Sequence, residues 1–326
     1  MGDYAVRALA HAKVNLHLGV GDAREDGYHE LVSVFQALDI YDVVELKTRG
    51  IVRAGEPTVV GMDVAGAYAH GVPADEQNLA WRAVEMVARG FRDRGVGELP
   101  GVYIGLSKGI PAAGGMAGGS ADAAAALRAA NEVFARASGR AGLGEPELYQ
   151  VAEELGSDVP FTLMGGTALG TGRGERLPEM LTRSCYCWAL ITSAEGLSTP
   201  AVFGELDRLR AAGQGGTPRL DSQPVAQALL RGTPEALAEV LANDLQPAAL
   251  SLRPDLRQTL RVGESAGALA GIVSGSGPTC AFLCADPEAA ADVVEEATTE
   301  IPGTRGLVAR GPACGAHLVE AAGSED

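Results

Sequence analysis

One glycine-rich segment has the residue types and spacing that most clearly favour binding of a charged ligand. Four of the six residues in Gly114–Gly119 are glycines, and Ser120 follows at the expected start of an alanine-rich helix. Glycine lets the backbone approach a ligand closely, and a helix N-terminus adds free N–H groups and the positive end of its dipole. Such a segment is typical of an anion site, most often for phosphate. The alternative is a flexible loop with an ordinary serine N-cap.

Neither of two well-known phosphate-binding patterns occurs in this segment. No Gly-Lys-Ser or Gly-Lys-Thr follows the glycines as in a Walker A loop, and the G-x-G-x-x-G pattern of dinucleotide-binding folds is absent from it. A second loop contains Gly275, Ser276 and Gly277 between two short expected strands. It is either a tight hairpin or a second set of amides near the same phosphates.

Lys13 and Asn15 alternate with apolar residues in the segment that ends at Val20, which predicts a strand with one polar face. Only three of the 26 basic residues are lysines: Lys13, Lys47 and Lys108. In a chain that otherwise uses arginine, a lysine indicates a need for a compact, tunable charge, and this argument favours Lys13 and Lys108. The ordinary alternative for Lys13 is a solvated lysine on an edge strand.

Asp158 follows Gly156-Ser157 and precedes Val159-Pro160, a pattern typical of the start of a helix. The functional alternative is a general base. An aspartate beside a lysine stays ionised and is able to accept a proton from a substrate hydroxyl group. The two interpretations are compatible with each other.

Three aromatic or imidazole side chains are candidates for contact with a flat ligand. Tyr28 and His29 follow the turn residues Asp26-Gly27 and place a ring and a hydrogen-bonding group on a loop. Phe203 lies near the start of the expected helix over residues 199–211. It either stacks on the ligand or fills the core, which is the usual place for a phenylalanine.

Charge and composition exclude several classes of protein. The formal net charge is −16, so nucleic-acid binding is not expected, because that affinity depends on Lys and Arg neutralising phosphates. No run of about 18 apolar residues predicts a membrane span, and the first residues do not resemble a signal peptide. The five cysteines show no C-x-x-C pair and the five histidines no metal-ligand spacing. We therefore expect a cytoplasmic protein with reduced cysteines and no metal site built from its own side chains.

The 326 residues suggest two domains of roughly 150 residues each. Helical and strand periodicities are mixed without strict alternation, which favours the α+β class. We expect one domain over residues 1–180, a second over 181–319, and a disordered tail over 320–326. The expected strands are 14–20, 30–40, 42–48, 102–106, 165–174, 188–192, 272–273, 279–283 and 307–310, and the expected helices are 79–91, which Asn78 would cap, 120–137, 148–155, 199–211, 222–231, 234–245, 254–266 and 287–300.

These segments occur in the order and spacing of the GHMP kinase superfamily, and the resemblance extends across most of the chain. The most discriminating piece resembles a D-G-Y-H-x-L motif. The matching segments are A-K-V-N-L at 12–16, D-G-Y-H-E-L at 26–31, the glycine loop at 111–120, L-G-S-D-V-P at 155–160, T-P-A-V-F at 199–203 and S-G-S-G at 274–277.

The resemblance implies a two-domain α+β kinase that binds ATP and its substrate in a cleft between the domains. By position, Asp158 matches the catalytic base and Lys13 the lysine beside it. The positions that match substrate-binding residues are Asn15, Tyr28, His29, Thr199 and Phe203, where Tyr28 and Phe203 would sandwich a cytosine and His29 would hydrogen-bond it. The positions that match the ATP-phosphate loop are Pro111, Gly114, Gly115, Gly118, Gly119 and Ser120, with Lys108 just before them and Gly275, Ser276 and Gly277 in the other glycine motif.

The sequence departs from the superfamily pattern at two places in the glycine loop. Ala121 stands where many members have a second serine, which leaves Ser120 as the candidate hydroxyl group. Met116-Ala117 replaces the more usual Leu-Gly, so the backbone is less free to approach a ligand at that point.

More narrowly, the sequence resembles superfamily members that act on a cytidine-diphosphate derivative of methylerythritol in the non-mevalonate isoprenoid pathway. The resemblance implies ATP-dependent phosphorylation of the tertiary 2-hydroxyl group, Mg²⁺ delivered with ATP, and a monomer or homodimer. A GHMP kinase for mevalonate, homoserine or a sugar is the nearest alternative, and it would lack the motif at 26–31. A regulatory protein that binds a nucleotide without catalysis is the alternative from another class.

Overall fold

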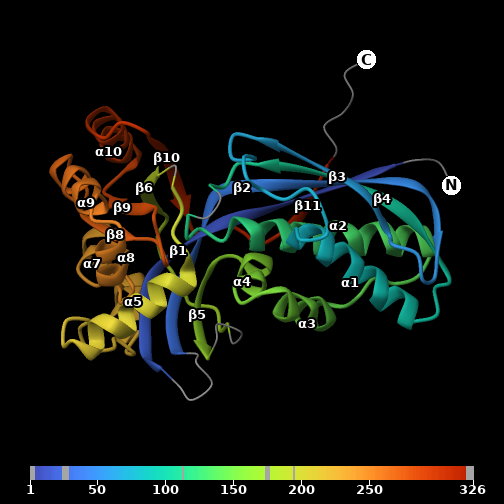
Figure 1. Ribbon diagram of the computed structural model, residues 1–326, viewed down its shortest axis with the longest axis horizontal. Coiled ribbons are helices and arrows are strands. Elements are labelled where there is room, and N and C mark those ends of the chain that lie inside the picture. Colours follow the sequence, from blue (N-terminus) through green and yellow to red (C-terminus); the bar gives the residue numbers. More distant parts are fainter. Residues whose placement is uncertain (1–3, 24–28, 112–113, 173–176, 194, 321–326) are drawn as a thin grey trace.

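The protein consists of two β-sheets with helices packed against them. A computed structural model describes residues 4–23, 29–111, 114–172, 177–193 and 195–320. Figure 1 shows α1 to α4 below the strands β2, β3 and β4 of the larger sheet in the right half of the view, and the smaller sheet with α7 to α10 in the left half. Within the described residues, the larger sheet comprises β1 (Ala5–Ala23), β2 (His29–Arg53), β3 (Val59–Gly66), β4 (Glu98–Lys108), β5 (Thr167–Gly172), β7 (Ala242–Asn243) and β11 (His317–Val319). The smaller sheet comprises β6 (Tyr186–Ser193), β8 (Ala270–Val273), β9 (Cys280–Cys284) and β10 (Thr304–Gly311).

The helices fall into two groups along the chain. The first group packs on the larger sheet and the second follows β6. Their bounds are α1 (Leu79–Asp93), α2 (Gly118–Ser138), α3 (Glu145–Leu155), α4 (Val159–Met164), α5 (Thr199–Ala211), α6 (Gln223–Arg231), α7 (Pro234–Ala238), α8 (Gln246–Leu252), α9 (Leu256–Ser265) and α10 (Pro287–Glu300).

The larger sheet has the order β11-β1-β2-β4-β3, with β5 also paired to β2 and β7 to β1. β1 and β2 are antiparallel, and their register places Lys13 opposite Ala37 and Asn15 opposite Phe35. β3 and β4 are parallel and α1 connects them, while most other pairs are antiparallel. This mixture confirms the predicted α+β class.

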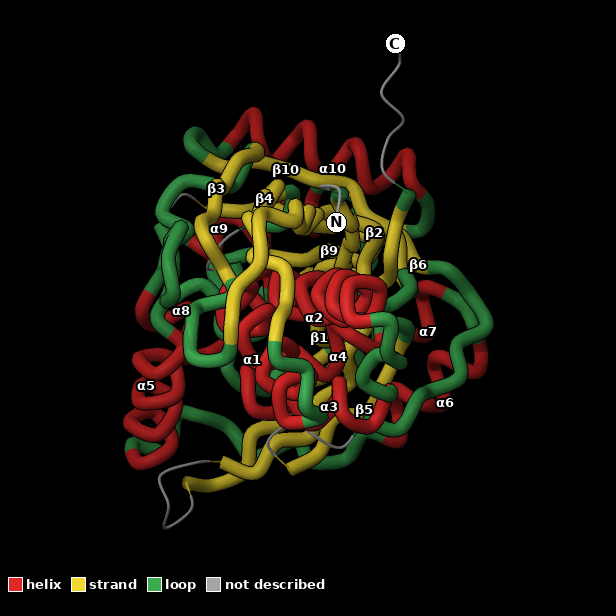
Figure 2. Tube along the Cα trace, turned by 90° about the vertical axis from the view of Figure 1, so that its right-hand side faces the viewer, coloured by secondary structure: helices red, strands yellow, loops and turns green. Residues whose placement is uncertain are grey.

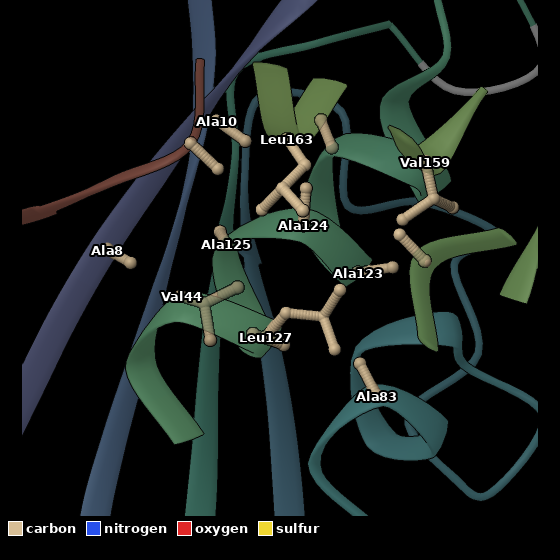
Figure 3. Close-up of a cluster of buried hydrophobic side chains, with 14 of the residues drawn as sticks. Ala8, Ala10, Val44, Ala83, Ala123, Ala124, Ala125, Leu127, Val159 and Leu163 are labelled. Carbon is tan, nitrogen blue, oxygen red and sulfur yellow. The ribbon is translucent and has the colours of Figure 1, made fainter. Parts of the chain in front are cut away.

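The alanine-rich helix α2 occupies the centre of the first group of helices (Figure 2). Nearly all of its side chains from Ala121 to Ala130 are buried, because alanine is small enough to let the sheet and three other helices approach one helix closely. Figure 3 shows this packing, with side chains from α2, β1, β2, α1 and α4 that include Ala8, Ala10, Val44, Ala83, Ala123, Ala124, Ala125, Leu127, Val159 and Leu163. A tight core of small residues thereby fixes the N-terminus of α2 relative to the sheet.

The smaller sheet buries both of its faces. Trp188 and Leu283 belong to the same core as α2, whereas Ala189 and Phe282, which alternate with them, pack in a second core with α5, α8, α9 and α10. Alternating side chains on one strand point to opposite faces, so this sheet connects the two cores. The predicted domain boundary at residue 180 stays a prediction, and β7 and β11 return to the larger sheet from beyond it.

Several predicted elements need correction. The two runs expected over 30–40 and 42–48 form one strand, β2, with a register shift where it passes Tyr41. The helix expected over 234–245 ends at Ala238, and the helix α2 begins at Gly118 and not at Ser120. Asn78 caps α1 as predicted, because its side chain accepts the N–H of Ala80 at 2.9 Å. Local sequence patterns do not predict β3, β7, α8 or β11.

Candidate functional site

A cavity of about 350 Å³ lies where β1, β2, the glycine loop, α5 and the loop after β8 meet. It brings together most of the candidate residues, although they come from segments far apart in the sequence. The candidates that line it are Lys13, Asn15, Gly114, Gly115, Gly118, Gly119, Asp158, Thr199, Phe203, Gly275, Ser276 and Gly277.

Other candidates lie outside the lining of this cavity. Pro111 lines a separate small pocket, with Tyr68 and Arg305. His29 does not line the cavity but contacts Phe203, which does, at a ring-centroid distance of 5.1 Å. Ser120 lies one residue beyond the lining glycines. The prediction for Tyr28 and that for the tail after residue 320 fall outside the described residues.

Lys13 joins the strand, the glycine loop and the start of α4. Its Nζ donates to Asn15 Oδ1 at 2.8 Å and to the Gly115 carbonyl oxygen at 3.0 Å, and lies 3.7 Å from Asp158 Oδ2. The Lys13 side chain is only 6% exposed, so it is not the solvated edge-strand lysine of the alternative interpretation. Since two of its three N–H groups are bonded within the protein, the ammonium is held in one place at the cavity wall.

Asp158 occupies the N-cap position of α4, but its side chain makes no capping hydrogen bond. A helix start therefore explains the position of Asp158 in the chain, but it does not explain why a carboxylate is present there. That carboxylate faces Lys13 and is 31% exposed at the cavity, so a substrate is able to reach it. A partly exposed carboxylate next to a fixed ammonium fits the role of a proton acceptor.

The N-terminus of α2 meets the cavity without a side-chain cap. The first hydrogen bond of the helix runs from the Ala121 N–H to the Ala117 carbonyl oxygen at 2.9 Å, so the N–H groups of residues 118–120 precede the ladder. Ser120 is thus in the first turn and not at the cap. Ala117 has a left-handed backbone with φ of 60°, which alanine adopts only at some cost in conformational energy. Backbone amides that precede the ladder and the positive end of the helix dipole fit a candidate anion site.

The two glycine loops contact each other at this end of the cavity. The Ser274 hydroxyl donates to the Gly115 carbonyl oxygen at 3.1 Å, which is also bonded to Lys13. Gly115 has φ of 74°, and a Cβ there would lie 2.0 Å from the Ser274 carbonyl oxygen, so a glycine is required. The second loop is therefore more than an isolated hairpin, because its backbone lies beside the candidate anion site.

Lys108 is buried among acidic side chains and does not line the cavity. Its Nζ donates to Asp42 Oδ2 and, at 2.7 Å, to Asp122 Oδ2, and all three side chains are at most 2% exposed. Asp42 Oδ1 also accepts the N–H groups of Gly109 and Ile110, at 2.7 and 2.9 Å. Burial raises the pKa of the Asp122 carboxyl group well above its usual range, against the opposing effect of Lys108. The predicted contact between Lys108 and ATP stays a prediction, and the geometry favours a structural role.

Several residues at the site have no obvious signal in the sequence. Ser33 and Phe35 line the cavity from β2, and Ser33 accepts a hydrogen bond from Asn15 at 2.7 Å. Asn243 donates to the carbonyl oxygens of Val273 and Gly275, both at 2.7 Å, and so holds the second glycine loop. The alternation of polar and apolar residues in β2 is the signal that could have identified Ser33. No local sequence pattern identifies Asn243.

Two features are absent from the part of the chain that the structure describes. It contains no group of three or more His, Cys, Asp or Glu side chains arranged to hold a metal ion. Nor does any helix there have the length and apolar character needed to cross a membrane.

Comparison with known proteins gives a consistent family. The profile described as "GHMP kinases N terminal domain" matches residues 78–166, and the one described as "GHMP kinases C terminal" matches residues 225–302. The chain is 52% identical over 318 residues to the 4-diphosphocytidyl-2-C-methyl-D-erythritol kinase of Mycolicibacterium smegmatis, covering 97% of this chain and 93% of that protein. It is also 52% identical to the protein of that name from Nocardia farcinica, covering 97% and 96%.

Two solved structures align with this chain over nearly its whole length. A crystal structure of 4-(cytidine 5'-diphospho)-2C-methyl-D-erythritol kinase aligns with a TM-score of 0.72 at 28% identity, covering 94% of this chain and 99% of the other. A homoserine kinase from Cytophaga hutchinsonii aligns with a TM-score of 0.71 at 19% identity, covering 97% of both chains. The second alignment supports the fold alone.

Proposed function

Since this chain belongs to the GHMP kinases and, within them, to the family of 4-diphosphocytidyl-2-C-methyl-D-erythritol kinases, we propose that it transfers the γ-phosphoryl group of ATP to the 2-hydroxyl group of 4-diphosphocytidyl-2-C-methyl-D-erythritol. This reaction is a step of the non-mevalonate route to isoprenoid precursors. One structural observation supports this proposal most directly. The cavity holds Lys13 and Asp158 together, beside an uncapped helix N-terminus.

The geometry suits the chemistry of phosphoryl transfer, which requires positioning and neutralisation of charge more than covalent help. The amides at the start of α2 would bind phosphate oxygens of ATP. The Lys13 ammonium would stabilise the ionised Asp158 and the charge that develops on the transferred group. Asp158 would accept the proton of the substrate hydroxyl group while the oxygen of that hydroxyl group bonds to the γ-phosphorus and ADP leaves.

We propose that Mg²⁺ arrives with ATP. Among the described residues, Asp158 is the one carboxylate in the lining of the cavity, which is too few for a cage built from protein ligands alone. Magnesium is commonly bound by one or two carboxylates together with substrate phosphates and waters, so this donor set fits. When bound, the ion would neutralise charge on the phosphates. We keep the cytoplasmic location and the monomeric or homodimeric state as predictions.

Replacement of Phe203 should weaken recognition of the cytidyl group. Phe203 lines the cavity from α5, and stacking of a base on an aromatic ring contributes about 1–3 kcal/mol. We expect Phe203→Ala to raise the KM for the cytidyl substrate roughly 5- to 100-fold while kcat changes little. Steady-state kinetics would measure this, with the KM for ATP as the internal control. An unchanged KM for the cytidyl substrate would remove Phe203 from the substrate site.

Replacement of Lys13 should damage catalysis more than folding. Lys13→Met keeps the length of the side chain and removes the charge next to Asp158. We expect kcat to fall by about 10²-fold, which is the scale of one electrostatic contact to a transition state. The surface variant Lys47→Met is the control, because Lys47 is half exposed and pairs only with Glu45 among its described neighbours. Activity of Lys13→Met close to that of Lys47→Met would contradict the role of Lys13.

An ADP-release assay on the purified chain tests the proposed function. Wild-type protein should release ADP with the cytidyl substrate, ATP and Mg²⁺, and should not do so with mevalonate or homoserine in its place. Preference for mevalonate or homoserine would assign the chain to another activity of the superfamily. Binding of ATP without release of ADP with any of the three substrates would favour the regulatory alternative.

A further inference from the structure

Helix α5 presents a carboxylate as well as an aromatic ring to the start of β2. Asp207 Oδ1 lies 2.8 Å from His29 Nε2, and the His29 ring lies 5.1 Å from the ring of Phe203 at an interplanar angle of 37°. Phe203 and Asp207 are four residues apart on α5, so they project from the same face of the helix. One imidazole is therefore held between a ring that lines the cavity and a carboxylate beside it.

This contact determines which ring nitrogen of His29 carries a proton. An ionised carboxylate only accepts hydrogen bonds, so Nε2 must be the donor in the bond to Asp207. In a neutral imidazole the other nitrogen is then an acceptor. The His29 side chain is 6% exposed and that of Asp207 is 42% exposed, so the ring is fixed while the carboxylate is partly hydrated. Asp207 thus leaves Nδ1 as the hydrogen-bond acceptor of His29.

An acceptor at this position would distinguish between two pyrimidines. Cytosine carries an exocyclic amino group that donates, whereas uracil carries a carbonyl oxygen at the same ring position, which only accepts. A lone pair on Nδ1 attracts the first group and repels the second. The opposite tautomer of the imidazole would reverse this preference.

We propose that Asp207 is a positioning residue for base recognition, which fixes the orientation and tautomer of His29 so that Nδ1 accepts a hydrogen bond from the amino group of cytosine. The proposal rests on the proposed function, because it takes the cytidyl group as the ligand. It adds to that function the origin of the selectivity for cytosine over uracil. Asp207 does not touch the reacting atoms and acts through His29.

Kinetics with two substrates tests this role. We expect Asp207→Ala to raise the KM for the cytidyl substrate about 5- to 20-fold with kcat nearly unchanged, and to lower the preference for the cytidyl substrate over its uridyl analogue at least fivefold. The matched control is Glu205→Gln on the same helix, whose carboxylate bonds to Arg208 and Ser251. It should keep the wild-type preference. If Asp207→Ala raises the KM for both substrates equally, or leaves both KM values unchanged, the proposal is wrong.

A second measurement does not depend on activity. The chain has five histidines, so ¹⁵N spectra of the histidine side chains are simple enough to assign with a His29→Gln variant. In the neutral limit of a pH titration, His29 of the wild type should carry its proton on Nε2, and Asp207→Ala should show a mixture of tautomers. A proton on Nδ1 in the wild type would overturn the proposal. If wild-type protein released no ADP with the cytidyl substrate, the proposed function would fail while the tautomer result remained valid.

Discussion

Asp158→Asn should abolish most turnover while leaving the protein folded and able to bind ATP. The carboxylate makes no capping bond to α4, so an isosteric amide removes little of the structure. It removes the proton acceptor that we propose for the substrate hydroxyl group, 3.7 Å from the Lys13 ammonium. General-base catalysis commonly contributes 10²- to 10⁴-fold, and we expect a loss of kcat of about that size.

Three measurements on Asp158→Asn separate chemistry from binding and folding. Single-turnover kinetics reports the chemical step, calorimetry reports the affinity for ATP, and thermal unfolding reports stability. Glu154→Gln is the matched control, since Glu154 is an exposed carboxylate in the preceding helix. Near-normal kcat in Asp158→Asn, or a loss of equal size in Glu154→Gln, would disprove the assignment of the base.

Lys108→Met should be the most destabilising of the single substitutions considered. It leaves Asp42 and Asp122 buried without the cation to which both are bonded. Removal of one partner from a buried ion pair costs about 3–5 kcal/mol, and we expect the free energy of unfolding to fall by that amount. Lys47→Met breaks a partly exposed pair with Glu45 and should cost about 1 kcal/mol or less.

The loss in Lys108→Met should grow as the pH rises. Burial already raises the pKa of the Asp122 carboxyl group against the opposing effect of Lys108, and without the ammonium that opposing effect is lost, so this pKa rises further above its value in the unfolded chain. The folded state then binds more protons than the unfolded state, so its stability decreases with increasing pH. Urea unfolding at pH 5 and pH 8 would measure this. Addition of Asp122→Asn, which removes one of the charges, should restore part of the stability at pH 8, and an equal loss at both pH values would contradict the explanation.

Local patterns in the sequence predict the elements that depend on local interactions. Asn78 before an amphipathic run predicts α1, and the alternation around Lys13 predicts part of β1. The strands β7 and β11 have two and three residues, too few to show a period, and they form because β1 offers free backbone groups to distant parts of the chain. The pairing of Ala242–Asn243 with β1, which follows the end of α7 at Ala238, is therefore invisible to local periodicity.

The candidate site was predictable in composition more than in geometry. Lys13 and Lys108 were equally favoured by the scarcity of lysine, yet one reaches the cavity and the other is enclosed by Asp42 and Asp122. Only the fold decides this, because the carboxylates come from another strand and from α2. The proximity of Asp158 to Lys13 across 145 positions was implied by family resemblance and not by spacing. The pair of His29 and Asp207 was not predicted.

The left-handed backbone of Ala117 has a consequence for how a nucleotide is received. A glycine at this point would sample both hands of the backbone, whereas alanine is confined by its Cβ and is held in the rarer one by the surrounding fold, including the bond from the Lys13 N–H to the Met116 carbonyl oxygen. The backbone around Met116 and Ala117 thus loses much of its conformational entropy when the chain folds and not when the ligand binds. An anion site ordered in advance gives up less entropy on association, and more of its contact energy appears as affinity.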